Sequence, residues 1–118
     1  MATLDELARE AYLNSKLKGF HERDFVKGAA LTTSGSQIAV TLINPSIDGE
    51  RLALIHSEVS ECLDDLRSGN DEGAEEELAD VIIRVLDFAE SKGWSMDKAV
   101  ANKMAKNKHR ERLHGKKW

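Results

Sequence analysis

The sequence predicts an all-α protein, a small bundle of about four helices, on the basis of three observations. The 118-residue chain contains a single proline and only 5% aromatic residues, a composition that disfavours a sandwich or barrel of short strands. Apolar residues recur at helical spacing in four separate segments. The length corresponds to one small domain, so residues 1–118 are expected to form a single domain.

The first helix is predicted over about residues 4–18, with Thr3 as its N-cap and Gly19 at its end. Residues 20–50 are predicted to be a long, partly irregular connection, because glycine, serine and Asn-Pro signals interrupt them. Within this connection the run 38–43 (IAVTLI) is either a short strand or a helical turn. Six residues are too few for periodicity to decide between them.

Three further helices follow, each with recognisable end signals. Ser46 or Asp48 is expected to cap the second helix, Asn70 or Asp71 the third, and Ser95 the fourth. The acidic first turns of the third helix suit the positive end of the helix dipole. The helices are predicted over about residues 52–67, 71–92 and 96–109, with a basic tail over residues 110–118.

The net charge of −4 conceals a strong asymmetry along the chain. Residues 1–49 carry a net charge of −1, residues 50–90 of −10, and residues 91–118 of +7. One interpretation is a pair of solvated faces, or a tail that binds nucleic acid non-specifically. The other is a carboxylate cluster that holds metal, with cations nearby for a polyanion. The tail lacks interleaved aromatic residues, which disfavours a nucleic-acid partner.

Several classes of protein are excluded. No stretch approaches the roughly 20 uninterrupted apolar residues that a membrane span needs. The first 20 residues mix charged and apolar positions, unlike a signal peptide. Cys62 is the only cysteine, so the chain has no intramolecular disulfide and no cysteine-based zinc site. A cytoplasmic protein without a membrane partner is expected.

Two pairs of acidic residues have the spacing of neighbours on a helix surface. They are Glu58 and Glu61 on the second helix, and Glu77 and Asp80 on the third. A short connection makes the two helices antiparallel neighbours, so all four carboxylates can converge. Hard oxygen ligands suit Mg²⁺ or Mn²⁺. The competing interpretation is a solvated acidic rim, because such spacings arise easily by chance where acids are this frequent.

The fourth helix changes from apolar to cationic along one face, where Lys103, Asn107 and Arg110 continue the apolar row. Buried cations need partners, and the acidic rim of the neighbouring helices is the expected one. Carboxylates with a metal, together with cations, would neutralise a phosphate chain from both sides. The alternative is a set of structural salt bridges, or lysines that reach into water.

Four short segments of the chain together resemble the MazG-like nucleoside triphosphate pyrophosphohydrolases: residues 14–21, 54–61, 76–82, and 103–108 with 114–117. Residues 54–61 (LIHSEVSE) are similar to the family's E-x-x-E helix, and residues 76–82 (EELADVI) to its E-x-x-D helix. Residues 103–108 (KMAKNK) with residues 114–117 (HGKK) resemble its C-terminal signature. Residues 14–21 (NSKLKGFH) are similar to the family's first helix and its exit. The order and spacing of the four motifs make the resemblance specific.

The resemblance implies an all-α fold that assembles as a homodimer or a dimer of dimers. It also implies hydrolysis of a nucleoside or deoxynucleoside triphosphate to the monophosphate and pyrophosphate, with Mg²⁺ as cofactor and Mn²⁺ able to substitute. A role in clearing the nucleotide pool follows for such an enzyme. Two alternatives stay open: a related hydrolase of the same superfamily acting on phosphoribosyl-ATP or a deoxynucleotide, and a non-enzymatic helical interaction module.

The resemblance also assigns roles to particular residues. Metal ligands would be the four acidic residues of the two pairs, and Glu58 and Glu61 would be catalytic, one of them accepting a proton from the water that attacks the α-phosphorus. The implied phosphate-binding residues are Lys103 and Asn107, with Lys106 and Arg110 as further candidates. The implied base and sugar pocket draws on Asn14, Lys18, Phe20 and His21.

Overall fold

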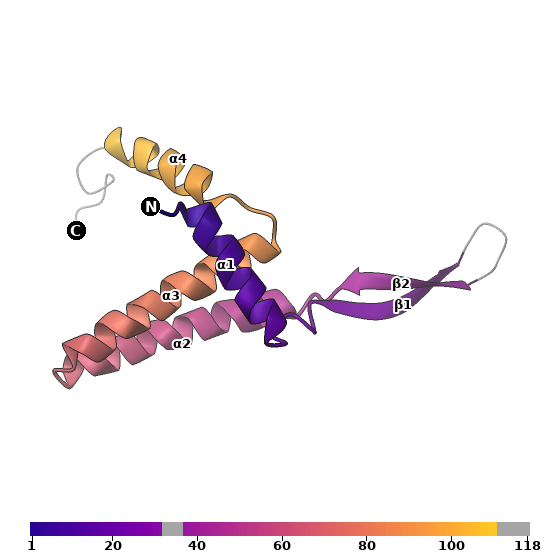
Figure 1. Cartoon of the computed structure of the whole chain (residues 1–118), viewed down its shortest axis with the longest axis horizontal. Coiled ribbons are helices and arrows are strands. Elements are labelled where there is room, and N and C mark those ends of the chain that lie inside the picture. Colours follow the sequence, from indigo (N-terminus) through magenta and orange to yellow (C-terminus); the bar gives the residue numbers. More distant parts are fainter. Residues whose placement is uncertain (32–36, 111–118) are drawn as a thin grey trace.

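The computed structural model describes residues 1–31 and 37–110, and it contains the four predicted helices (Figure 1). The expected tail lies almost entirely outside this part of the chain, at residues 111–118. The helices are α1 (Leu4–Leu17), α2 (Ile47–Arg67), α3 (Asp71–Ser91) and α4 (Met96–Lys108).

The helix ends follow from local sequence signals. Side chains of three predicted caps accept hydrogen bonds from backbone N–H groups: Thr3 from Glu6, Asn70 from Gly73, and Ser95 from Lys98. Gly69 has φ +77° in the turn between α2 and α3, a conformation that costs other residues strain. Helix α2 begins at Ile47, directly after Ser46, whereas its apolar pattern predicted a start at about residue 52.

The connection between α1 and α2 differs from the expected irregular segment. It forms an antiparallel hairpin of β1 (Phe25–Leu31) and β2 (Gln37–Ile43), with Phe25 opposite Ile43. The run 38–43 is therefore a strand, consistent with its β-branched residues. The prediction of an all-α chain is confirmed for the four helices and wrong for this hairpin, which projects away from them (Figure 1).

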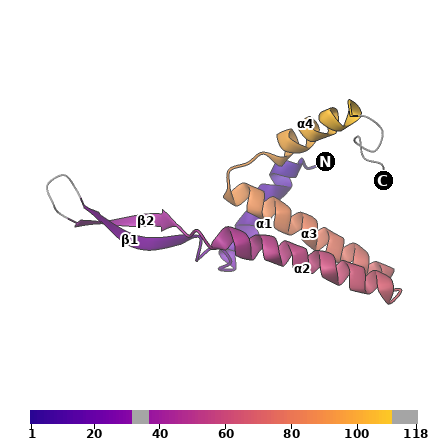
Figure 2. The same ribbon diagram turned by 180° about the vertical axis from the view of Figure 1, so that it is seen from behind.

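The helical body is built on an antiparallel pair, α2 and α3, with α1 packed across α3 and α4 against α1 (Figures 1 and 2). A reciprocal clasp joins the beginnings of α1 and α4. The Asp97 carboxylate accepts from the backbone N–H groups of Leu4 and Asp5, at 3.0 and 3.2 Å. The Asp5 carboxylate in turn accepts from the Asp97 backbone N–H at 3.1 Å and the Ser95 hydroxyl at 2.6 Å.

The core of the single chain is thin. Small side chains account for much of it, including Ala8, Ala74, Ala89 and Cys62. Large apolar side chains on α2 and α3 stay between 47% and 56% exposed, namely Leu52, Leu54, Val59, Leu63, Leu66, Leu78, Ile82 and Ile83. Within the described residues, none of the helices has both the length and the apolar character to cross a membrane.

Candidate active site

Three of the four predicted acidic residues converge between α2 and α3. One carboxylate oxygen from each of Glu58, Glu77 and Asp80 lies within 4.8 Å of the others. We call these three residues the acidic cluster. Glu58 is only 9% exposed, although its helix has a mostly exposed surface. The fourth predicted ligand, Glu61, is exposed and stands outside the cluster.

The electrostatics of the acidic cluster favour the binding of a cation or a proton. Oε2 of Glu77 is buried and has no hydrogen-bond partner among the described residues. A hydrogen bond that protonated Glu77 makes with Glu58, partial desolvation, and the charges of Glu61 and Glu58 together raise the pKa of Glu77 to about 7. Because a metal ligand must be deprotonated, a divalent ion at this carboxylate would displace a proton.

One cation is already in contact with the acidic cluster. The Nε–H of Arg84 donates to Oε1 of Glu58 at 2.9 Å. Arg84 lies on α3 one turn beyond Asp80, so both side chains are on the same face of that helix. The ion pair holds the Glu58 carboxylate in place while its second oxygen is left to another partner.

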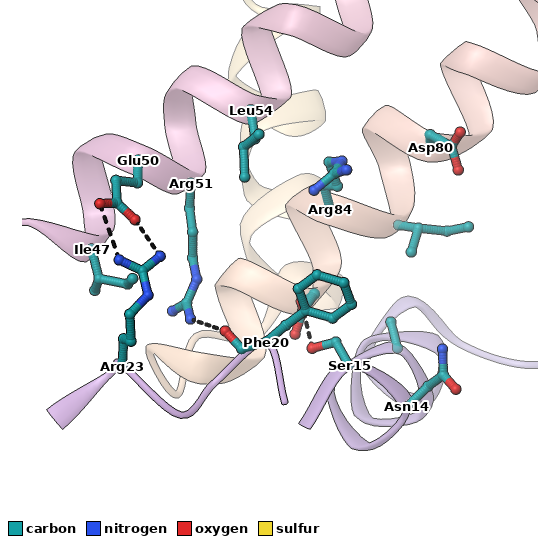
Figure 3. Close-up of a pocket in the computed structure, with 13 residues that line it drawn as sticks. Asn14, Ser15, Phe20, Arg23, Ile47, Glu50, Arg51, Leu54, Asp80 and Arg84 are labelled. Carbon is teal, nitrogen blue, oxygen red and sulfur yellow. Dashed lines mark hydrogen bonds and ion pairs between the residues drawn. The ribbon is translucent and has the colours of Figure 1, made fainter. Parts of the chain in front are cut away.

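A cavity of about 270 Å³ adjoins the acidic cluster (Figure 3). Asp80 and Arg84 belong to its lining, which makes the cluster and the cavity one continuous site. The other walls come from α1, the segment that follows it, and the beginning of α2. The charged residues lining this cavity are Arg23, Glu50, Arg51, Asp80, Arg84 and Asp87.

The residues expected to form a base and sugar pocket divide into two groups. Asn14 and Phe20 line the cavity, and Phe20 is 70% exposed (Figure 3). Lys18 is exposed and is not part of the lining. His21 is buried, with Nδ1 2.6 Å from Asp24 and Nε2 2.7 Å from Asp87. Because both ring nitrogens are occupied, His21 supports the cavity wall in this conformation.

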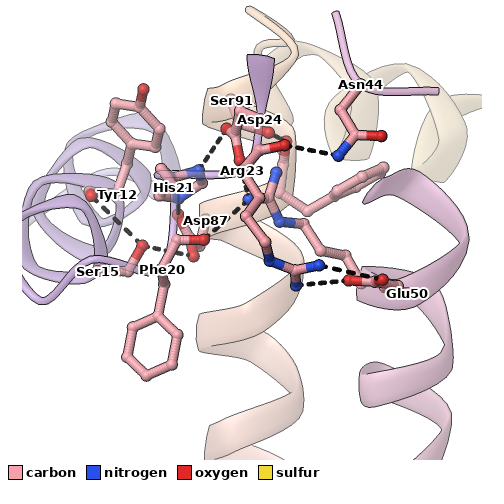
Figure 4. A network of polar contacts seen from close by, with 12 residues as sticks. Tyr12, Ser15, Phe20, His21, Arg23, Asp24, Asn44, Glu50, Asp87 and Ser91 are labelled. Carbon is pink, nitrogen blue, oxygen red and sulfur yellow. Dashed lines mark hydrogen bonds and ion pairs between the residues drawn. The ribbon is translucent and has the colours of Figure 1, made fainter. Parts of the chain in front are cut away.

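A polar network fixes the wall around His21 (Figure 4). The Ser15 hydroxyl donates to Asp87 at 2.9 Å, and Arg51 donates to Asp24. Burial opposes ionisation of Asp24, but hydrogen bonds from Arg51 and His21 outweigh it and lower the pKa of that carboxyl. The network ties α1 to α2 and α3 and so holds the cavity open between them.

The structure corrects the expected place of the basic face of α4. Lys103, Lys106, Asn107 and Arg110 are all exposed, and their helix packs against α1, away from the α2–α3 pair (Figures 1 and 2). The clasp to α1 sets this direction. Within a single chain, these four residues, which we call the basic row, therefore do not reach the acidic cluster.

Sequence reasoning missed the three arginines of the cavity, although the spacing of two of them carried a signal. Arg51 precedes Glu58 by seven residues, and Arg84 follows Glu77 by seven, so each pair occupies one helix face. Asp87 is related to Asp80 in the same way. A search two helical turns along α2 and α3 from the predicted acidic pairs would therefore have found Arg51, Arg84 and Asp87.

A family model described as the MazG nucleotide pyrophosphohydrolase domain matches residues 50–113, more than half of the chain. The matched segment contains the whole acidic cluster together with Arg51 and Arg84. The hairpin and α1 precede it. No curated protein and no solved structure matches the chain.

Proposed function

Because the chain belongs to the MazG nucleotide pyrophosphohydrolase family, we propose that it is a Mg²⁺-dependent enzyme that hydrolyses a nucleoside or deoxynucleoside triphosphate to the monophosphate and pyrophosphate. The observation that carries the proposal is the convergence of Glu58, Glu77 and Asp80 beside a cavity lined by arginines. We treat residues 1–118 as one catalytic domain, because α1 supplies part of the cavity wall.

The donor set of the acidic cluster fits Mg²⁺. All three groups offer hard carboxylate oxygens, and Oε2 of Glu77 is a buried acceptor without a hydrogen-bond partner among the described residues. When bound, Mg²⁺ supplies positive charge that stabilises the phosphates and lowers the pKa of a bound water. Glu58, Glu77 and Asp80 would hold the ion, and Arg84 would orient Glu58.

Glu61 is the proposed general base. It lies one turn beyond Glu58, is exposed, and raises the pKa of Glu77 by its charge, so it stands next to the cluster without being part of it. Glu61 would take the proton of a water whose oxygen bonds to the α-phosphorus. The bond from that phosphorus to the α–β bridging oxygen then breaks, and pyrophosphate leaves with the electron pair.

A second copy of the chain is part of the proposal. The half-exposed apolar side chains of α2 and α3 form a surface that self-association would bury, either in a dimer or in a dimer of dimers. The exposed basic row of α4, with Lys103 and Asn107, would then reach the phosphates bound by a neighbouring copy.

The test is pyrophosphate release from a panel of ribo- and deoxyribonucleoside triphosphates, assayed with and without Mg²⁺ in H₂¹⁸O. We expect pyrophosphate as product, the heavy oxygen in the monophosphate, and loss of turnover in Glu61→Gln. Glu72→Gln, an exposed acid in the first turn of α3, is the matched control and should keep wild-type turnover. Phosphoribosyl-ATP belongs in the panel.

Two results would contradict the proposal. Heavy oxygen in pyrophosphate would place the attack at the β-phosphorus. Absence of turnover on every substrate, with no Mg²⁺-dependent rise in melting temperature, would favour the helical interaction module, because an ion that binds only the folded state must stabilise it.

A further inference from the structure

Arg84 contacts both halves of the proposed site. Its Nε–H holds Glu58 of the acidic cluster at 2.9 Å, and its side chain lines the cavity beside Asp80 (Figure 3). Building on the proposed function, we propose that Arg84 does two things at once: it positions Glu58 for the metal ion, and it binds a phosphate group of the nucleotide held in the cavity.

The geometry of the guanidinium permits both contacts. Arginine carries five N–H donors in a rigid planar fork. Glu58 accepts from Nε, and among the described residues Arg84 has no second hydrogen-bond acceptor. Its side chain remains 42% exposed, so the terminal NH₂ groups are accessible to a ligand. A phosphate matches such a fork through paired charge-assisted hydrogen bonds.

The other cations of the cavity are already committed to carboxylates outside the acidic cluster. Arg51 pairs with Asp24 and also donates to the Phe20 carbonyl oxygen at 3.2 Å. Arg23 makes two hydrogen bonds to Glu50, at 2.7 and 3.3 Å. Arg84 therefore differs from both, because its carboxylate partner is itself a proposed metal ligand.

The charge balance of the site also requires a cation at this position. Three converging carboxylates repel a polyphosphate unless positive charge stands between them and the ligand. The basic row of α4 is remote within the chain, whereas Arg84 is one turn from Asp80 on the same helix. Its contact with Glu58 would couple the position of the phosphate to the position of the metal.

The experiment compares the wild type with Arg84→Lys, which keeps the charge but loses the fork, and with Arg67→Lys, a conservative change of an exposed arginine at the end of α2. The probe is inorganic tripolyphosphate as its Mg²⁺ complex, which is independent of base and sugar. Calorimetry gives its dissociation constant and, separately, that of Mg²⁺ alone. Circular dichroism checks that each variant is folded.

For Arg84→Lys we expect the dissociation constant of tripolyphosphate to rise at least about tenfold, the effect of losing one charged hydrogen bond. The dissociation constant of Mg²⁺ alone should also rise about tenfold or more, as happens when an outer-shell partner of a ligand is removed. The Arg67→Lys variant should match the wild type in both titrations.

Unchanged tripolyphosphate affinity in folded Arg84→Lys would overturn the proposal, and so would weakened tripolyphosphate binding with unchanged Mg²⁺ affinity. Either result leaves pyrophosphate release by the wild type intact, so the failure of this inference is separable from the failure of the proposed function. If the wild type neither binds tripolyphosphate nor releases pyrophosphate, both this inference and the proposed function are wrong.

Discussion

Mg²⁺ binding at the acidic cluster should expel a proton near neutral pH. Glu77 is the source, since its pKa is raised to about 7 by its contact with Glu58, by partial desolvation and by the charge of Glu61. The ionised form binds the metal, so bound Mg²⁺ and bound proton exclude each other at this carboxylate. The substitution Glu77→Gln should abolish this proton release.

The magnitude follows from the pKa. A group with a pKa of about 7 is half protonated at pH 7, so about 0.5 proton leaves for each ion bound, rising to about 0.9 at pH 6 and falling to about 0.1 at pH 8. The apparent Mg²⁺ affinity should accordingly rise about tenfold from pH 6 to pH 8. Acid weakens Mg²⁺ binding, because at low pH the Glu77 carboxyl of the metal-free folded protein holds a proton that the metal must displace.

Calorimetric titration of Mg²⁺ at pH 7, in two buffers of different ionisation enthalpy, measures the proton count directly. Glu77→Gln should bind Mg²⁺ more weakly, release no proton and show a flat pH dependence. Glu76→Gln, its exposed neighbour outside the cluster, should release the same fraction of a proton as the wild type. Equal heats in the two buffers for the wild type would refute the reasoning.

The remaining predictions concern stability and assembly. Gly69→Ala should lower the free energy of unfolding by about 1 kcal/mol, because the φ of Gly69 is +77°. Gly49→Ala within α2 should raise the free energy of unfolding by about 0.5 kcal/mol, because an added Cβ there meets nothing within 4 Å. Urea titration measures both changes. The Ser95 hydroxyl and the Asp97 backbone lower the pKa of Asp5 below 3.8, so the clasp strengthens the fold at neutral pH and is lost as the pH falls through that lowered value. Hydrogen exchange should show acid-induced loss of protection in α4, and Asp5→Asn should lose that protection already at neutral pH. Leu63→Lys on the exposed apolar face of α2 should reduce the sedimentation coefficient to that of a monomer, while Asp64→Lys beside it should leave the assembly intact.

The helices and most of their ends were predictable because the signals are local. Thr3, Asn70 and Ser95 act as caps through hydrogen bonds to residues three positions away, and Gly69 turns the chain within a few residues. The hairpin was not predictable on the same grounds. A six-residue apolar run has no decisive period, and strand pairing depends on residues such as Phe25 and Ile43, which are 18 positions apart.

The acidic cluster was predictable in large part, since helical spacing and a short turn bring Glu58 opposite Glu77 and Asp80. Glu61 has the same spacing from Glu58 that Asp80 has from Glu77, yet only Asp80 joins the cluster, so helical spacing alone does not decide which member of a pair converges. The direction of α4 depends on a clasp between residues more than 90 positions apart, Asp5 and Asp97, which no local pattern encodes.

The most direct test of the central claim is the anomalous difference density of crystals grown with Mn²⁺ in place of Mg²⁺. We predict a peak about 2.0–2.2 Å from carboxylate oxygens of Glu58, Glu77 and Asp80, lost in Glu77→Gln. Density confined to the surface acids Glu72 and Glu75 at the start of α3, or no density at all, would contradict a divalent-ion site between α2 and α3.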